Sequence, residues 1–143
     1  MNEERLVERF LRYVSCDSES RAELPFCKLI EDELRELGLQ VYIDPVGPPC
    51  GSNGYNIIAK LAGDGEPLLF CAHLDTVEPG KGIRPVIEDG IIRSSGETIL
   101  AADDKSGVAA IMEALSQIVE GGLPHRPVEV LFTVCEEIGL LGS

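Results

Sequence analysis

The sequence has few basic residues and no long apolar run. Lysine and arginine together number 12 against 25 aspartates and glutamates, which gives a formal net charge of −13. This charge argues against nucleic acid or an anionic membrane as a partner. No apolar segment approaches the length of roughly 20 residues that a transmembrane helix needs. The first ten residues, MNEERLVERF, are charged and do not follow the basic-then-apolar pattern of a signal peptide.

Cysteine and histidine are also scarce. The five cysteines are an odd number at irregular spacings, and no Cys-x-x-Cys pair indicates a zinc knuckle or a redox motif. Cys71 and Cys135 lie inside apolar runs, which predicts that they are small core residues. Together with the charged amino terminus, these features predict a cytoplasmic protein in a reducing setting.

Hydrophobic periodicity predicts alternating helices and strands, and 143 residues suit one domain. Helices are expected from residue 2 to near 16, from about 21 to 37 and from about 104 to 121. Strands are expected over 39–43, 55–61, 68–72 and 128–135, with a hairpin of 85–87 and 91–93 around Asp89-Gly90. This order predicts an α/β fold, a three-layer α/β/α sandwich with a mostly parallel mixed sheet.

The apolar run 68–72 ends abruptly in His73, a spacer and Asp75. The run has the length and composition of a strand that is buried on both faces. If the chain stays extended, both polar side chains project to the same side. The carboxylate could then hold one imidazole nitrogen so that the other nitrogen meets a metal or a proton. A turn aspartate beside a surface histidine is the alternative interpretation.

Acidic residues stand at two more element ends. Glu136 and Glu137 follow the last predicted strand, and Asp103 lies at the entrance of the last predicted helix. Open α/β sheets bind ligands at the carboxyl ends of their strands. If the strands that end at His73 and Glu136 are parallel neighbours, one histidine and several carboxylates converge there. Cations would have to compensate so many like charges.

Each acidic pair also has a simpler explanation. Asp103 and Asp104 could cap a helix, and the two glutamates could be a solvated strand end. Only the coincidence of all three groups at one sheet edge favours a metal site. One imidazole and one carboxylate suit two zinc-like ions as individual ligands, and a third carboxylate can bridge ions roughly 3.5–4 Å apart. A remaining glutamate could accept a proton, and spacing does not tell which of the two it is.

Four segments together resemble the peptidase T-like branch of the dinuclear zinc aminopeptidases and their carboxypeptidase and deacylase relatives. They are GYNIIAKL, CAHLDTVEPGKGI, DGIIRSSGETILAADDKSGVAAIMEAL and VLFTVCEEIGLLGS. The resemblance implies that His73 binds one zinc ion and that Asp75 orients it. It further implies that Asp103 bridges two zinc ions, that Glu136 is the general base and that Glu137 binds the second ion. Cobalt or manganese could replace zinc.

The resemblance also implies a substrate and a domain organisation. It predicts an aminotripeptidase that acts on short peptides, and it suggests a homodimer. A carboxypeptidase, an N-acyl amino acid deacylase and a non-catalytic metal-binding fragment are the alternatives. Such enzymes carry a further aspartate ligand, a distant histidine ligand and an inserted dimerisation or lid domain. We therefore expect residues 1–143 to be the amino-terminal portion of a catalytic domain and to be inactive alone, with His125 as a surface residue.

Overall fold

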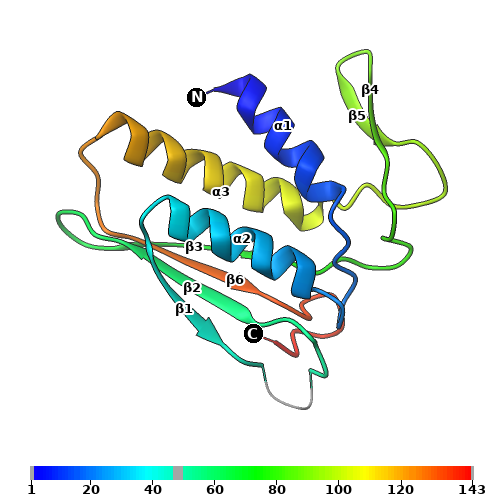
Figure 1. Cartoon of the computed structure of the whole chain (residues 1–143), viewed down its shortest axis with the longest axis horizontal. Helices are drawn as coiled ribbons and strands as arrows, with labels where there is room; N and C mark the ends of the chain where they lie inside the picture. The colour runs from blue at the N-terminus through cyan, green and yellow to red at the C-terminus, as the bar shows by residue number, and fades with distance from the viewer. Residues whose placement is uncertain (1, 47–49, 143) are drawn as a thin grey trace.

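The computed structural model describes residues 2–46 and 50–142 and confirms an α/β fold with a mixed sheet. Helices pack along one side of a four-stranded sheet, and a separate hairpin extends from the body of the molecule (Figure 1). The elements are α1 (Glu3–Val14), α2 (Leu24–Glu36), β1 (Gln40–Asp44), β2 (Asn56–Leu61), β3 (Leu68–His73), β4 (Pro85–Glu88), β5 (Ile91–Ser94), α3 (Ala102–Gly121) and β6 (Val128–Thr133). None of the described helices is long and apolar enough to cross a bilayer.

The first two helices begin where local sequence signals allow. The side chain of Asn2 accepts a hydrogen bond from the Arg5 N–H at 3.1 Å and so caps α1, as predicted. By contrast, α2 begins at Leu24 and not near Arg21. Arg21 has a left-handed φ of 76°, and Glu19, two residues earlier, bridges to Thr76 beyond β3. The chain is therefore held beside the segment that follows β3 before it turns into α2.

In the strand order β1-β2-β6-β3, β6 lies between β2 and β3. β3 and β6 are parallel neighbours, as the convergence of polar residues requires, and His73 lies opposite Thr133. Among the described strands of this sheet only β3 and β6 pair in parallel, because β1 pairs antiparallel with β2 and β2 pairs antiparallel with β6. The prediction of a mostly parallel sheet is therefore too strong for the described strands. Residues 45–55 join β1 to its neighbour β2, and this connection is shorter than a parallel crossover usually needs, which favours antiparallel pairing.

The core fills the space between the helices and one face of the sheet. Alternate residues of β2 and β6 point toward the helices, as the two-residue period of a strand requires. They pack against apolar side chains of α2 and α3 in one cluster. Its fully buried members include Ile57, Ala59, Val130 and Phe132 from the sheet, and Phe26, Ile30, Leu34, Val108 and Met112 from the helices.

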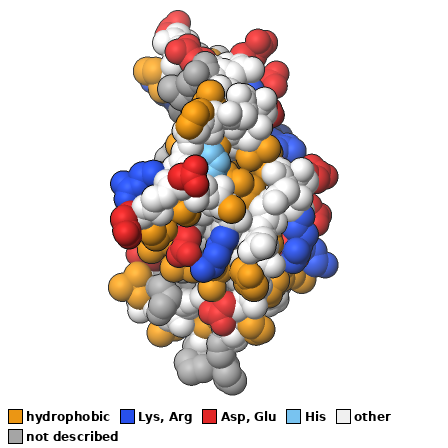
Figure 2. Space-filling model, turned by 90° about the vertical axis from the view of Figure 1, so that its left-hand side faces the viewer, with side chains coloured by type: hydrophobic (Ala, Val, Ile, Leu, Met, Phe, Trp, Pro, Cys, Tyr) orange, Lys and Arg blue, Asp and Glu red, His pale blue; other side chains and the backbone are white. Residues whose placement is uncertain are grey.

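The opposite face of the sheet is open in the described part of the chain. Tyr42, Ile58, Leu131 and Cys71 form one row across the four strands on this face. The predictions that residues 68–72 form a strand buried on both faces and that Cys71 is a core residue are wrong. Leu69 is 64% exposed and Cys71 is exposed, because β3 lies at the end of the sheet and the described helices α2 and α3 pack on the other face. Hydrophobic side chains also reach the surface among charged ones in the space-filling view (Figure 2).

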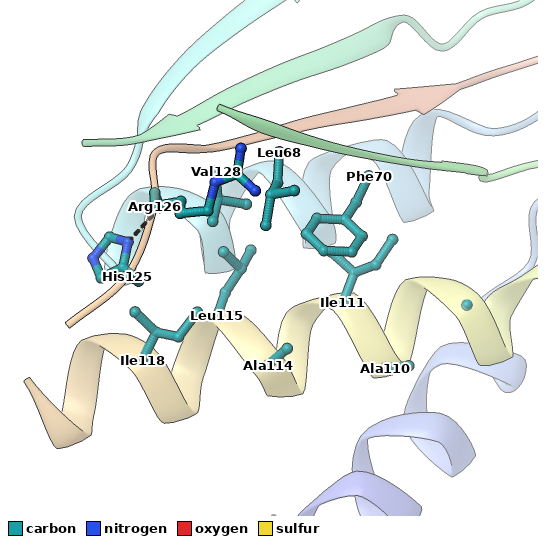
Figure 3. A pocket seen from close by; sticks show the side chains of 11 residues that line it. Leu68, Phe70, Ala110, Ile111, Ala114, Leu115, Ile118, His125, Arg126 and Val128 are labelled. Atoms are coloured by element: carbon teal, nitrogen blue, oxygen red, sulfur yellow. Dashed lines mark hydrogen bonds between the residues drawn. The ribbon is translucent and has the colours of Figure 1, made fainter. Parts of the chain in front are cut away.

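A cavity of about 400 Å³ lies between β3 and α3. Leu68 and Phe70 from the strand face Ile111, Leu115 and other apolar side chains of the helix (Figure 3). His125 lies beside this cavity, in the segment before β6, and is half-buried. It therefore stands at the end of β6 opposite Glu136, as predicted, although it is not fully exposed.

The predicted hairpin is confirmed as β4 and β5. Asp89 and Gly90 both have positive φ, 51° and 75°, as a type I′ turn requires. In Figure 1 the hairpin stands apart from the four-stranded sheet, near the end of α3 that begins at Ala102.

An ion pair joins α1 to α3, and it should make stability depend on pH. Arg5 Nε lies 2.7 Å from the Glu113 carboxylate, whose side chain is 2% exposed. The hydrogen bond from Arg5 lowers the pKa of Glu113 below its usual 4.5. We expect Glu113→Gln to reduce the free energy of unfolding by about 1.5–3 kcal/mol at neutral pH, as measured by urea denaturation.

The difference between Glu113→Gln and the parent chain should shrink in acid. A carboxyl whose folded pKa is lowered contributes stability above its unfolded pKa, and this contribution is lost as pH falls through the folded value. The difference in unfolding free energy should therefore narrow as the pH falls below 4.5. Glu120→Gln is the matched control, because Glu120 also binds Arg5 but is 55% exposed. It should cost at most about 1 kcal/mol. A difference in unfolding free energy between Glu113→Gln and the parent chain that does not change with pH would contradict this account.

Candidate metal centre

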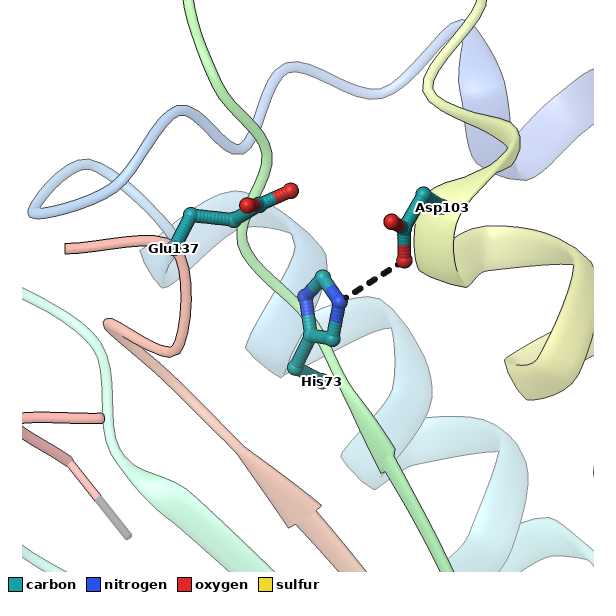
Figure 4. A group of neighbouring side chains, drawn as sticks. All are labelled: His73, Asp103 and Glu137. Atoms are coloured by element: carbon teal, nitrogen blue, oxygen red, sulfur yellow. Dashed lines mark hydrogen bonds and ion pairs between the residues drawn. The ribbon is translucent and has the colours of Figure 1, made fainter. Parts of the chain in front are cut away.

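Three of the predicted site residues meet at the carboxyl ends of β3 and β6. One ligand atom each from His73, Asp103 and Glu137 lies within 4.8 Å of the others. Figure 4 shows that they come from the end of β3, the start of α3 and the turn after β6. These residues are 30 or more positions apart along the chain, so the fold brings together what the sequence keeps separate.

The His73 ring is held at both nitrogens. Nδ1 lies 2.9 Å from the backbone oxygen of Asp75, and Nε2 lies 3.0 Å from Asp103 Oδ1. Burial lowers the pKa of His73, but the interactions with Asp75 and Asp103 outweigh burial and raise the pKa to about 9. A hydrogen bond from Nδ1 to a carbonyl is the arrangement that leaves Nε2 as the ligand nitrogen.

Asp75 is fully buried and organises the turn after β6. Its Oδ1 accepts from the Glu136 N–H at 2.9 Å, and its Oδ2 accepts from the Glu137 N–H at 3.1 Å and from Ser20 Oγ at 2.7 Å. Burial raises the pKa of Asp75, but His73 and these hydrogen bonds lower the pKa by more than burial raises it, so the net shift is downward. The carboxylate itself is 3.6 Å from His73 Nδ1. The backbone oxygen, and not the predicted carboxylate, therefore makes the closer contact with the imidazole.

The entrance of α3 separates the roles of its two aspartates. Asp103 and Asp104 have non-helical backbone angles, and the peptide bond between them is cis. Asp104 Oδ1 accepts from the Gly107 N–H at 3.2 Å, which is the capping role. The side chain of Asp103 is 83% exposed and points toward His73 (Figure 4). The capping explanation therefore applies to Asp104 and leaves Asp103 free to bind a cation.

The two glutamates differ in their surroundings. Burial, followed by the charges of Asp103, Asp75 and Glu136, raises the pKa of Glu137 above its usual 4.5, although His73 opposes the shift. A nearby cation would relieve this repulsion. Glu136 is not among the three clustered ligands, but its Oε2 lies 3.9 Å from His73 Nε2. It therefore stands beside the cluster without belonging to it.

Two residues that support the site were not singled out from the sequence. Ser20 binds Asp75, as described above. Glu23 is fully buried and accepts from the N–H groups of Arg21 at 2.9 Å and of Cys135 at 3.2 Å. These contacts hold the turn that leads to Glu136. Ser20 is 55 positions from Asp75, and Glu23 is 112 positions from Cys135, so no local spacing could have indicated either.

Cys135 is buried as predicted, but it is not free. It forms a disulfide with Cys50, whose Cα lies 6.4 Å from its own. The loop before β2 brings Cys50 against the end of β6, and this proximity depends on the fold and not on sequence spacing. The free cysteines of the described residues are Cys16, Cys27 and Cys71.

Comparison with known proteins finds related peptidases. Residues 56–143 match the sequence model of peptidase family M28. The chain is 40% identical over 145 residues to the uncharacterised protein YqjE of Bacillus subtilis, covering 100% of this chain and 39% of YqjE. It is 30% identical over 178 residues to peptidase T of Citrobacter koseri, covering 95% of this chain and 43% of that protein.

Two crystal structures share the fold closely. A tripeptidase from Staphylococcus aureus has a TM-score of 0.93 at 35% identity, covering 99% of this chain and 39% of that one. Aminopeptidase PepT from Bacillus cereus has a TM-score of 0.93 at 40% identity, covering 98% of this chain and 38% of that one.

The fold and the cluster at its sheet edge define a peptidase-type α/β domain. The chain belongs to peptidase family M28, and its resemblance to peptidase T is confirmed. It spans about two fifths of the length of the relatives compared above.

Proposed function

We propose that this chain forms part of the active site of a zinc aminopeptidase that acts on short peptides, tripeptides in particular. The observation that carries the proposal is the convergence of His73, Asp103 and Glu137 within 4.8 Å, with Glu136 beside them. The names of the relatives, peptidase T, tripeptidase and aminopeptidase PepT, support the substrate class. We further propose a cytoplasmic setting and a homodimer.

The residues present fit zinc. One imidazole nitrogen and two carboxylates are ligands that zinc accepts. The contact of Nδ1 with the Asp75 backbone oxygen directs His73 Nε2 toward the exposed Asp103 carboxylate. In the proposed site His73 and Glu137 would each hold one of two ions, and the Asp103 carboxylate would contribute to holding both. Cobalt or manganese would suit the same ligands.

The chain's own residues would carry the proton transfers. Zinc, when bound, supplies Lewis acidity that polarises the peptide carbonyl and lowers the pKa of a water. The Glu136 carboxylate accepts a proton from the attacking water and then donates it to the nitrogen of the leaving amine. Asp75 holds the backbone N–H of Glu136 and so keeps this carboxylate beside the ligands.

Adjacent substitutions in the intact protein test the proposal. Glu136→Gln should reduce the rate of tripeptide hydrolysis by about 10²–10⁴-fold, the usual contribution of a general base, while zinc content is unchanged. Glu137→Gln is the matched control and should lose zinc together with activity. The two measurements are peptide release by chromatography and zinc content by elemental analysis after dialysis. Full activity in Glu136→Gln, or hydrolysis of N-acyl amino acids in preference to tripeptides, would refute the proposal.

A further inference from the structure

Lys105 is a buried cation that the proposed chemistry does not use. It is 1% exposed, and its Nζ donates to the backbone oxygen of Cys16 at 2.5 Å and lies 4.5 Å from the centre of the Phe26 ring. No carboxylate of the described residues lies within ion-pair distance of it. A buried charge without an opposite charge is costly, and an apolar side chain would be the cheaper filling. The position therefore calls for a specific explanation.

The carbonyl that Lys105 binds belongs to the loop between α1 and α2. This loop is attached to the chain just after β3. Thr76 N–H donates to the Ser18 oxygen at 3.0 Å, and Ser20 N–H donates to the Thr76 oxygen at 3.1 Å. Ser20 Oγ also donates to the carboxylate of Asp75 at 2.7 Å. The loop is therefore fixed to the part of the site that contains His73 and Asp75.

Along the chain, Lys105 lies two residues after Asp103, near the start of α3. The Asp103 side chain is exposed, and among the described residues its hydrogen-bonding partner is His73. Its position relative to the histidine therefore depends on how the start of α3 is held. The Lys105 ammonium holds the start of α3 to the loop that also binds Asp75. One buried side chain therefore connects the segment that carries Asp103 to the segment that carries His73.

We propose that Lys105 is a positioning residue that sets the placement of Asp103 relative to His73 and thereby the affinity of the cluster for metal. This inference rests on the metal site of the proposed function. A merely structural role would instead make Lys105 important for stability and leave metal affinity unchanged in a folded variant. The two roles are separable, because positioning predicts a loss of affinity without a loss of stability.

Lys105→Met tests this difference, since methionine fills the apolar stem and removes the ammonium. We expect the zinc dissociation constant, measured by competition with a chelating dye, to rise about 10–100-fold, as for other residues that orient metal ligands. The midpoint of urea unfolding of the metal-free chain should stay unchanged or rise. Lys60→Met is the matched control, because Lys60 is an exposed lysine paired with Glu129, and it should change neither quantity. An unfolded or destabilised Lys105→Met would overturn the proposal.

A double-mutant cycle tests the route through the loop. Ser20→Ala removes the loop's bond to Asp75, so it should also weaken zinc binding. If both residues act through this loop, the double variant Ser20→Ala with Lys105→Met should lose less affinity than the product of the two single losses. Fully multiplicative losses, or unchanged zinc affinity in Lys105→Met, would overturn the positioning role alone. Absence of zinc binding in the parent chain would instead refute the metal site of the proposed function.

Discussion

Replacing Asp75 by alanine is expected to reduce the free energy of unfolding by about 3–5 kcal/mol and to remove zinc binding. Asp75 is fully buried and accepts from the N–H groups of Glu136 and Glu137 and from Ser20. Alanine would leave these donors without their acceptor, at about 1–3 kcal/mol for each buried donor. The turn that carries both glutamates would then lose its fixed position, and the ligand cluster would open.

Urea denaturation of the metal-free chain and a zinc titration measure the two parts of this expectation. Asp64→Ala is a suitable control, because Asp64 is an exposed turn residue far from the site in the loop before β3. Its effect on stability should stay within about 0.5 kcal/mol. A change in unfolding free energy below about 1 kcal/mol for Asp75→Ala, with zinc binding intact, would show that the three hydrogen bonds do not organise the site.

The second large effect is expected on zinc affinity, and the two histidines of the chain allow it to be tested. His73→Ala should weaken zinc binding by at least about 100-fold, because loss of a ligand exceeds the 10–100-fold cost of losing a residue that orients one. His125→Ala is the matched control, since His125 lies at the opposite end of β6 and contacts the backbone oxygen of Arg126. It should bind zinc as the parent chain does.

Thermal unfolding provides an independent measurement of the same effect. A ligand that binds the folded state raises the unfolding temperature by mass action. Added zinc should therefore raise the unfolding temperature of the parent chain and of His125→Ala but not of His73→Ala. Equal zinc-dependent stabilisation in both histidine variants would exclude His73 as a ligand. Loss of stabilisation in both would indicate that zinc binds elsewhere or that both changes disturb the fold.

Local patterns in the sequence predicted most of the elements correctly. The cap at Asn2 and the Asp89-Gly90 hairpin depend on interactions within a few residues, and the strands that end at His73 and before Glu136 are marked by local apolar runs. The same patterns placed His73, Asp103 and Glu137 at element ends, where a sheet with β3 beside β6 brings them together. Their roles as ligands, and that of Glu136 as base, stay predictions that the experiments above address.

Contacts between distant segments could not be read in this way. The exposure of β3 and Cys71 depends on which face of the sheet the helices cover, and composition does not determine that. Lys105 reaches a carbonyl 89 positions away, and Asp75 binds backbone groups more than 60 positions away. The sequence by itself determined the elements and the chemical character of the site, because these are local properties. Only the tertiary structure decided which side chains position the ligands, because that depends on the packing of segments far apart in the chain.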